Sequence, residues 1–232
     1  MTNILLTGSS RGIGAAIAET LRNGGHHVVG HGTASGIAAD FADPAAPDRL
    51  WDAALAQLDG RIDVLINNAG VFEANPLDDA DDAWLANWER TMQVNLTASA
   101  ILCRRAVRHW HERGCGGRIV NVASRAAYRG DSPAHWHYAA SKAGMVAMTK
   151  TIARGYAAQG ILAFAICPGF TMTGMAEDYL ASRGGDKLLA DIPLGRVAAP
   201  DEVAEAARWL ALDAPASMTG AVIDVNGASY VR

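Results

Sequence analysis

Short apolar runs alternate with longer amphipathic segments along almost the whole chain. The apolar runs are typical of buried strands and fall at residues 4–6, 28–29, 64–66, 118–122, 161–166 and 221–225. Segments with the 3.6-residue apolar spacing of helices lie between them, at residues 13–22, 44–58, 83–111, 136–159 and 200–212. This alternation predicts an α/β fold of the Rossmann type, a doubly wound parallel sheet of about seven strands with helices on both faces.

One connection between strands is too short for a helix. The second apolar run ends at residue 29 and the next extended stretch is expected near residues 36–39, so only residues 31–35 separate them. A crossover helix needs roughly a dozen residues. We therefore expect a shortened crossover, a loop, within one domain spanning residues 1–232.

Composition and charge exclude several classes of protein. Half of the 232 residues are hydrophobic, yet no apolar run is long enough to cross a bilayer. The net charge of -4 lacks the basic excess that nucleic-acid binding needs. Cys103, Cys115 and Cys167 have no metal-ligand spacing, and the first residues do not form a signal peptide. We expect a cytoplasmic protein with no metal, nucleic-acid or membrane partner.

A glycine-rich turn lies between the first strand and the first helix, with the sequence Thr7-Gly8-Ser9-Ser10-Arg11-Gly12-Ile13-Gly14. Glycines let backbone N–H groups approach a phosphate, and the following helix presents its positive end. Such a turn alone can be only a turn, but its place one strand into a βαβ chain favours dinucleotide binding.

The end of the second strand indicates which dinucleotide is preferred. A carboxylate there would bind the ribose hydroxyls of NAD(H), but the residues are Gly30-His31-Gly32-Thr33. Arg11 offers a planar fork to a 2′-phosphate, with Thr33 or His31 as further donors. NADP(H) is favoured. NAD(H) remains the alternative, in which Arg11 is only a solvated surface cation.

Tyr138 and Lys142 lie four residues apart in a helical segment, hence on one face. A nearby ammonium group stabilises a phenolate and lowers the pKa of the phenol. By itself this spacing also fits an amphipathic surface pair. Ser124 strengthens the catalytic interpretation because it follows the strand at residues 118–122, at the sheet edge where such folds bind ligands.

In their order and spacing these residues resemble the classical short-chain dehydrogenases/reductases, including members similar to 3-oxoacyl-(acyl-carrier-protein) reductases. The resemblance runs along essentially the whole chain. It covers the turn at residues 7–14, Asp40-Phe41, Asn67-Asn68-Ala69-Gly70, Asn95, Ser124, Tyr138, Lys142, Pro168-Gly169 and Val225-Asn226-Gly227.

The resemblance implies a role for each matched residue. Tyr138 would be the general acid/base and Ser124 would orient the substrate carbonyl, while Lys142 would bind the ribose and Asn95 would support a water-mediated proton path. The implied cofactor contacts are Gly8, Ser10, Arg11, Gly12, Ile13, Gly14, His31, Thr33, Asp40, Phe41, Asn67, Ala69, Gly70, Tyr138, Lys142, Pro168, Gly169, Thr171 and Thr173. Simpler interpretations remain open: Asn67 and Asn95 could close strand or helix ends, Asp40 could be a loop acid and Thr173 a helix N-cap.

Two further segments are expected near the substrate. The loop at residues 125–137 is unusual in holding Tyr128, Arg129, Asp131, His135, Trp136 and His137, some of which we expect to line the cleft. Residues 174–196, which contain Gly184-Gly185, resemble the family's substrate lid. The helix at residues 83–111 resembles its subunit contact, which implies a homodimer or homotetramer.

Three functions are consistent with the sequence. The leading one is an NADPH-dependent reductase of ketones or 3-oxoacyl thioesters. A second is an NAD(P)+-dependent alcohol, polyol or sugar dehydrogenase with the same site run in reverse. A third is a non-catalytic nucleotide-binding regulator, which the presence of Asn95, Ser124, Tyr138 and Lys142 together disfavours.

Overall fold

The computed structural model describes residues 1–172 and 189–232 of the chain. Its centre is one seven-stranded sheet with the order β3-β2-β1-β4-β5-β6-β7, in which every neighbouring pair is parallel. The strands are β1 (Asn3–Leu6), β2 (His27–Gly32), β3 (Ile37–Ala38), β4 (Val64–Asn67), β5 (Gly117–Val122), β6 (Ile161–Pro168) and β7 (Val222–Val225). The predicted Rossmann-type α/β fold is therefore confirmed.

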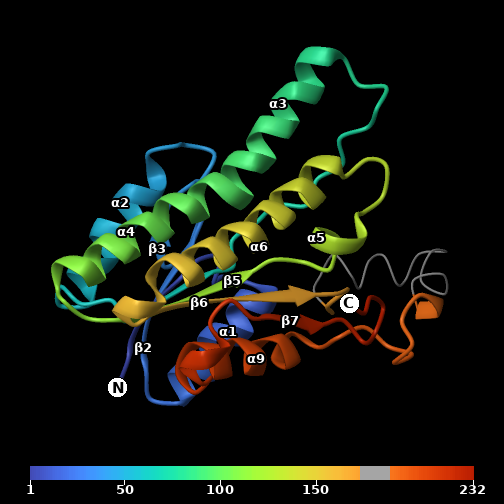
Figure 1. The fold of residues 1–232 in the computed structure, drawn as a ribbon. Helices are drawn as coiled ribbons and strands as arrows, with labels where there is room; N and C mark the ends of the chain where they lie inside the picture. The colour runs from blue at the N-terminus through green and yellow to red at the C-terminus, as the bar shows by residue number, and fades with distance from the viewer. Residues whose placement is uncertain (173–188) are drawn as a thin grey trace.

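Helices cover both faces of this sheet (Figure 1). One face carries α1 (Gly12–Asn23) and α9 (Pro200–Leu212), and the other carries α2 (Ala46–Gln57), α4 (Ala98–Glu112) and α6 (Trp136–Tyr156). Short helical turns at α5 (Ala126–Arg129), η2 (Ala157–Gln159) and η3 (Ala216–Met218) complete the connections. In the described part of the chain, no helix combines the length and apolarity that a membrane span requires.

The two hydrophobic cores follow from side-chain alternation along the strands. Leu5, Leu65 and Ile119 pack with α2 and α4, whereas their neighbours Ile4 and Ile66 pack with α1 and α9. Successive side chains of a strand point to opposite faces, so a strand covered on both faces must be apolar throughout. The uninterrupted apolar runs of the sequence are the direct consequence.

A four-residue loop, residues 33–36, connects β2 to β3, and the predicted short crossover is confirmed. The strands pair in parallel with His31 opposite Ile37, which brings the loop close to the backbone of β2. Gly36 has φ +68°, and a Cβ placed on it would lie 2.2 Å from the carbonyl oxygen of Gly30. Only glycine fits this position.

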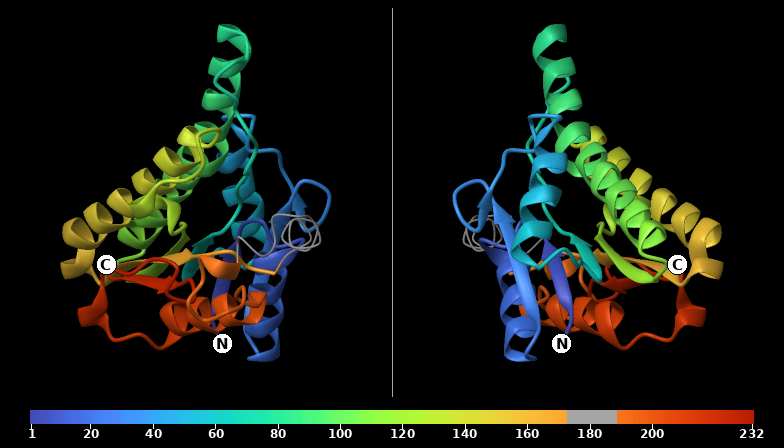
Figure 2. Two further views of the ribbon diagram at one scale, coloured as in Figure 1. Left: turned by 90° about the vertical axis from the view of Figure 1, so that its right-hand side faces the viewer. Right: turned by 90° about the vertical axis from the view of Figure 1, so that its left-hand side faces the viewer.

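The helix predicted at residues 83–111 is longer and internally divided. It begins with α3 (Asp81–Met92), passes through a π-helical turn, η1 (Gln93–Thr97), and continues into α4 without leaving the helix path (Figure 1). Both side views show α3 extending beyond the other helices (Figure 2). A π turn inserts one extra residue, which sequence periodicity does not reveal, and such turns are frequent at functional sites.

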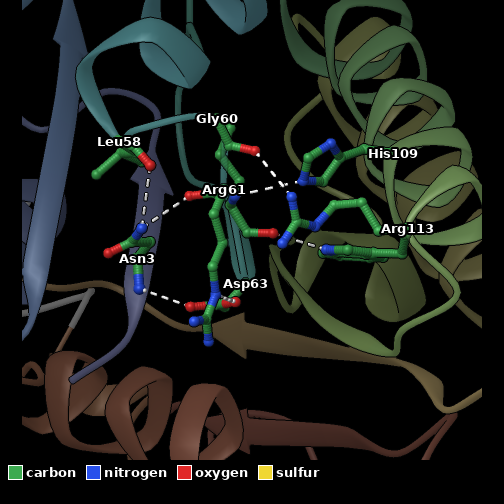
Figure 3. Close-up of polar contacts among 9 residues, drawn as sticks. Asn3, Leu58, Gly60, Arg61, Asp63, His109 and Arg113 are labelled. Carbon is green, nitrogen blue, oxygen red and sulfur yellow. Dashed lines mark hydrogen bonds and ion pairs between the residues drawn. The ribbon is translucent and has the colours of Figure 1, made fainter.

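Polar contacts fix the amino-terminal end of β1 against the segment that precedes β4 (Figure 3). The side-chain amide of Asn3 donates to the carbonyl oxygens of Leu58 and Arg61 at 3.2 and 2.9 Å, and its backbone N–H donates to Asp63 at 2.9 Å. His109 on α4 accepts from the backbone of Ile62 at 3.4 Å. This edge is thus held rigidly, on the side of the sheet away from the predicted site.

Candidate active site

The carboxyl ends of the parallel strands bring most of the predicted site residues to one edge of the sheet. The glycine turn follows β1, His31 lies at the end of β2 with Thr33 just after it, Gly70 follows β4, Ser124 follows β5 and Gly169 follows β6. This is the edge at which open α/β sheets bind ligands, on both sides of the point where the strand order reverses.

The turn after β1 is shaped for close approach of a phosphate group. Gly8 and Gly12 have φ values of +67° and +53°, and a Cβ on Gly14 would lie 1.9 Å from the carbonyl oxygen of Gly8. Arg11 is the N-cap of α1 and gives no side-chain hydrogen bond to the helix. The glycines therefore let the turn pack tightly against the start of α1, and a tight turn that leads into a helix N-terminus fits the phosphates of a dinucleotide.

Asn68 holds this turn against the end of β4. Its side-chain amide donates to the carbonyl oxygens of Thr7 and Gly8 at 3.1 and 2.9 Å. The hydroxyl of Thr7 in return accepts from the backbone N–H groups of Asn68 and Ala69, both at 3.0 Å. The sequence prediction omitted Asn68 although the quoted motif contained it.

Asn67 is not brought to the cofactor edge by its side chain. It is fully buried, and its amide donates to Asn121 on β5 at 2.9 Å and to the sulfur of Cys103 on α4 at 3.3 Å. Residues 67 and 68 are consecutive at a strand end and face opposite sides, so only one of them can meet the cofactor edge. The structure gives that position to Asn68.

His31 is engaged within the fold. The ring is buried, stacks on Phe41 with centroids 4.3 Å apart, accepts from the N–H of Gly8 at 3.3 Å through Nδ1, and bonds the carbonyl oxygen of Ala39 at 3.0 Å through Nε2. It offers no free donor to a 2′-phosphate in this arrangement. Burial lowers the pKa of His31, and the Ala39 contact partly opposes this shift.

Arg11 and Thr33 are exposed at the same edge. The backbone carbonyl of Arg11 accepts from the N–H of Ala15, but its side chain has no hydrogen bond or ion pair to any residue in the described ranges, so its guanidinium is free to meet a ligand. Asp40 is also exposed and accepts from the N–H of Ala42 at 2.9 Å, while its neighbour Phe41 is buried against His31. Of the two neighbouring cofactor contacts that the resemblance implies, Asp40 and Phe41, only Asp40 therefore presents its side chain outward.

Asn95 lies in the π-helical turn and holds the segment after β4. Its Oδ1 accepts from the N–H of Val71 at 2.8 Å, and its Nδ2 donates to the carbonyl oxygen of Val71 at 3.0 Å and to the hydroxyl of Ser141 at 3.3 Å. A Cβ on Gly70 would lie 3.2 Å from Asn95 Oδ1 and 3.5 Å from Lys142 Nζ. Asn95 and Lys142 thus meet around the Cα of Gly70.

Tyr138 and Ser124 form the centre of the site. The hydroxyl of Ser124 is within hydrogen-bonding reach of the phenol oxygen of Tyr138, and it accepts from the N–H of Ala126 at 3.1 Å. Lys142, one turn along α6, is buried and donates to the carbonyl oxygen of Val122 at 2.9 Å. The structure therefore brings together all four predicted catalytic residues.

The pKa values of Tyr138 and Lys142 are set by burial. Desolvation raises the pKa of Tyr138 to about 12, with the Ser124 hydrogen bond opposing it, and lowers the pKa of Lys142 to about 8. The expected lowering of the phenol pKa by Lys142 is not seen in the chain alone. Both groups lose water, and the cation lies 5.8 Å from the phenol ring centroid while it bonds Val122.

Aromatic rings gather beside Tyr138. Phe72, which sequence reasoning missed, contacts Tyr138 edge-on and stacks on His135. His137 is buried beside Trp88. Neither of its ring nitrogens meets the geometry of a hydrogen bond with any of the residues that the structure describes. Burial lowers the pKa of His137, an effect that nearby Glu73 partly opposes. The sequence signal available for Phe72 was its position two residues after Gly70.

The remaining residues of the 125–137 loop have structural partners. Arg125 and Arg129 both contact the carboxylate of Asp191, at 3.5 and 2.7 Å, and the guanidinium of Arg125 lies over the ring of Phe170. Tyr128 stacks on Tyr230, and Asp131 accepts from the N–H of Ser132. These contacts join the loop after Ser124 to the carboxyl-terminal part of the chain.

The last of the implied cofactor contacts, Pro168, Gly169, Thr171 and Thr173, begin where β6 ends at Pro168. A Cβ on Gly169 would lie 2.9 Å from the Cα of Asn226, and the buried hydroxyl of Thr171 donates to the carbonyl oxygen of Gly169 at 3.3 Å. Thr173 and residues 174–188 of the predicted lid lie outside the described residues. Within the described ranges no three His, Cys, Asp or Glu side chains converge as a metal site, and the three cysteines are free.

Comparisons with known proteins agree with this geometry. A family model described as enoyl-(acyl carrier protein) reductase matches residues 8–228. The chain is 36% identical to 3beta-hydroxysteroid dehydrogenase 1 of Eggerthella lenta, covering 97% of this chain and 92% of that protein. It is 34% identical to D-threitol dehydrogenase of Mycolicibacterium smegmatis, covering 98% and 92% respectively.

Two further matches bear on the cofactor and the substrate. The chain is 33% identical to a 3-oxoacyl-(acyl-carrier-protein) reductase of Salmonella typhimurium, covering 98% of this chain and 96% of that protein. A crystal structure of a 2-deoxy-D-gluconate 3-dehydrogenase, so named provisionally, from Agrobacterium tumefaciens with bound NADP superposes with a TM-score of 0.88 at 29% identity, covering 100% and 97% of the two chains.

Proposed function

The chain belongs to the short-chain dehydrogenase/reductase family of NAD(P)-dependent oxidoreductases acting on CH–OH groups, and from this premise we propose that it is an NADP(H)-dependent carbonyl reductase with Tyr138 as its acid. One observation supports this proposal above the others. The Tyr138 hydroxyl bonds Ser124 and has a pKa of about 12, so it holds its proton at neutral pH and is poised to give it to a carbonyl oxygen.

Each catalytic residue has a defined part in this reaction. A dihydronicotinamide, when bound, supplies the hydride to the carbonyl carbon. Ser124 donates a hydrogen bond to the carbonyl oxygen and fixes its position, and Tyr138 protonates that oxygen as charge develops on it. Lys142, with a pKa of about 8, is largely protonated at neutral pH and stabilises the phenolate that remains.

Asn95 supports the return of a proton to Tyr138. Its hydrogen bonds to Val71 and Ser141 fix the Asn95 side chain near Gly70, close to the ammonium group of Lys142. We propose that water bound there carries a proton through Lys142 to the phenol. The contacts of Asn95 to both segments also make it a positioning residue for the π turn.

Preference for the phosphorylated cofactor rests on Arg11. This exposed cation lies in the phosphate turn and has no partner among the residues described by the structure, and no acid ends β2 to repel a 2′-phosphate. A structural neighbour with 29% identity contains NADP. We further propose a homodimer or homotetramer in the cytoplasm, with the long α3–α4 helix as its contact.

The substrate we propose is a ketone or a 3-oxoacyl thioester, since one relative of 33% identity is a 3-oxoacyl reductase. The alternative is an alcohol, polyol or sugar dehydrogenase using the same residues in the reverse direction, which the similarity to a threitol dehydrogenase favours. Both directions use the same phenol: Tyr138 gives its proton to the oxygen in reduction and takes a proton from the hydroxyl group in oxidation.

A substrate panel tests the proposal. Ketones, 3-oxoacyl thioesters, alcohols and polyols are assayed with NADPH or NADP+ and with NADH or NAD+, at matched pH. Reduction of at least one carbonyl class with NADPH preferred over NADH is expected. Oxidation of polyols with no carbonyl reduction would favour the alternative. Binding of NADPH with no turnover of any compound would indicate a non-catalytic nucleotide-binding module.

A further inference from the structure

Phe72 places an aromatic ring directly beside the reacting phenol. It lies on the connection between β4 and α3, and its ring contacts that of Tyr138 edge-on, with centroids 4.7 Å apart and an interplanar angle of 81°. The side chain is 38% exposed, which is unusual for a phenylalanine next to a buried polar site. The open part of this ring is therefore available to a ligand.

The other side of the Phe72 ring is covered by His135. The two rings are stacked with centroids 4.0 Å apart and an interplanar angle of 6°. Ser132 holds the imidazole in place, because its hydroxyl lies 2.6 Å from His135 Nδ1 and its carbonyl oxygen accepts the backbone N–H of His135 at 2.9 Å. Phe72 is thus supported by a fixed neighbour and does not need a ligand to order it.

The supported ring pair, Phe72 and His135, is also uncharged at neutral pH. Burial lowers the pKa of His135, with Asp131 opposing the shift, so the imidazole stays neutral to a lower pH than an ordinary histidine does. One of its two nitrogens is already bonded to Ser132. The part of the Phe72 ring that is left exposed beside Tyr138 therefore offers apolar contact and little hydrogen bonding.

These observations select among substrate classes. A polyol brings several hydroxyl groups that would lose water against Phe72 without gaining partners there. A linear acyl chain can pack against a ring, but it gains none of the ring–ring preference that offset or edge-to-face aromatic geometry adds. A flat ring near the carbonyl can lie against the open part of Phe72 while its oxygen reaches Ser124 and Tyr138.

We propose that Phe72 is a specificity-determining residue and that the preferred substrate carries a flat hydrophobic ring near its carbonyl group, within about two methylene groups of it. This inference rests on the carbonyl-reductase function proposed above and narrows its substrate class. His135 acts as a positioning residue, since it supports Phe72 and does not itself touch the substrate.

Two methyl ketones with equal numbers of carbon atoms, 4-phenyl-2-butanone and 2-decanone, provide the test. Their kcat/KM ratio is measured with NADPH for the unmodified chain and for Phe72→Leu, Phe72→Tyr and Leu77→Ala. Leu77 is the matched control, because it is an apolar residue on the same connection, is 72% exposed, and takes no part in the ring contacts of Phe72, Tyr138 and His135. We expect the phenyl ketone to be preferred, Phe72→Leu to reduce that preference roughly twofold to tenfold through KM, and Phe72→Tyr and Leu77→Ala to retain it.

An unchanged ratio in Phe72→Leu, or an equal loss with both ketones, would overturn the assignment of specificity to Phe72. Absence of turnover with either ketone would count against the proposed function itself. Isothermal titration of 4-phenyl-2-butanone into the NADP+ complex then still tests Phe72, since weaker binding to Phe72→Leu than to Leu77→Ala is expected whether or not the ketone is reduced.

Discussion

The imidazole of His31 accepts a hydrogen bond from the backbone N–H of Gly8 over 3.3 Å, and so joins the phosphate turn to the end of β2. Its other nitrogen lies 3.0 Å from the carbonyl oxygen of Ala39. Both contacts are satisfied together only by a neutral ring that carries its proton on Nε2. The shape of the turn therefore depends on the protonation state of a residue buried beneath it.

Acid is expected to weaken cofactor binding through His31. Burial lowers its pKa in the folded chain, so the folded chain takes up this proton at lower pH than the unfolded chain. Its contribution to stability is present above about pH 6.5 and is lost as pH falls through the lower folded value. NADPH affinity and urea stability should both fall over this range. His31→Phe keeps the stacking on Phe41 and should make both NADPH affinity and urea stability less dependent on pH. His27→Gln, at the exposed start of β2, is the control and should leave both pH dependences as they are.

Removal of the Tyr138 hydroxyl should abolish turnover. Tyr138→Phe deletes the proton donor but keeps the ring packed against Phe72, so kcat should drop by roughly 10²–10⁴-fold while the Kd for NADPH stays within about twofold. Tyr156→Phe, at the far end of the same helix, is the matched control. Retained turnover in Tyr138→Phe would refute its assignment as the acid.

Arg11→Ala should discriminate between the two cofactors. Loss of a charge-assisted hydrogen bond to a 2′-phosphate should weaken NADPH by roughly 10- to 100-fold and leave NADH almost unchanged. Arg22→Ala is the matched control. It removes an exposed cation from the last turn of the same helix, where the guanidinium of Arg22 donates to the carbonyl oxygen of Val28. Fluorescence titration of both nucleotides measures the effect, and equal losses for both would contradict the phosphate role.

Thr149 and Thr151 form a matched pair for testing the buried polar network. Each hydroxyl donates to the carbonyl oxygen four residues earlier, but only buried Thr149 also accepts from the side chain of Asn121, at 2.8 Å. Thr149→Val leaves that amide unsatisfied and should cost about 1–3 kcal/mol of unfolding free energy. Thr151→Val, at an exposed site, should change it little. Urea unfolding measures both variants.

The rate of reaction with a thiol reagent should distinguish the exposed cysteine from the two buried ones. Desolvation raises the pKa of Cys103 to about 12 and that of Cys167 to about 11, and both are buried, whereas Cys115 is exposed. A disulfide reagent at pH 8 should titrate one thiol quickly in the native chain and all three after denaturation. Rapid reaction of more than one native thiol would contradict the buried positions.

Hydrophobic periodicity was sufficient for the architecture. Strands covered on both faces must be apolar throughout, so their runs were visible, and the short segment before Gly36 ruled out a crossover helix. Tyr138, Ser124, Lys142 and Asn95 could likewise be selected because their spacing and order matched one family. For the strands and for these four residues, the local sequence pattern and the overall fold lead to the same prediction.

The direction in which individual side chains point could not be predicted from the sequence. The choice between Asn67 and Asn68 depends on which of two consecutive residues faces the core, and the engagement of His31 depends on a contact across two strands. The π turn that carries Asn95 leaves no periodic signature in so short a segment. Phe72 became recognisable only when the chain brought it against Tyr138 from 66 residues away.

The two ends of the sheet also bear on pairing between neighbouring molecules. An edge strand with unpaired backbone groups is a template for intermolecular pairing and aggregation. At one end, the four-residue loop leaves β3 only two residues long, too short to recruit a neighbouring chain. At the other, the guanidinium of Arg232 donates to the carbonyl oxygen of Val222 and pairs with Asp224, so a terminal cation occupies the free edge of β7.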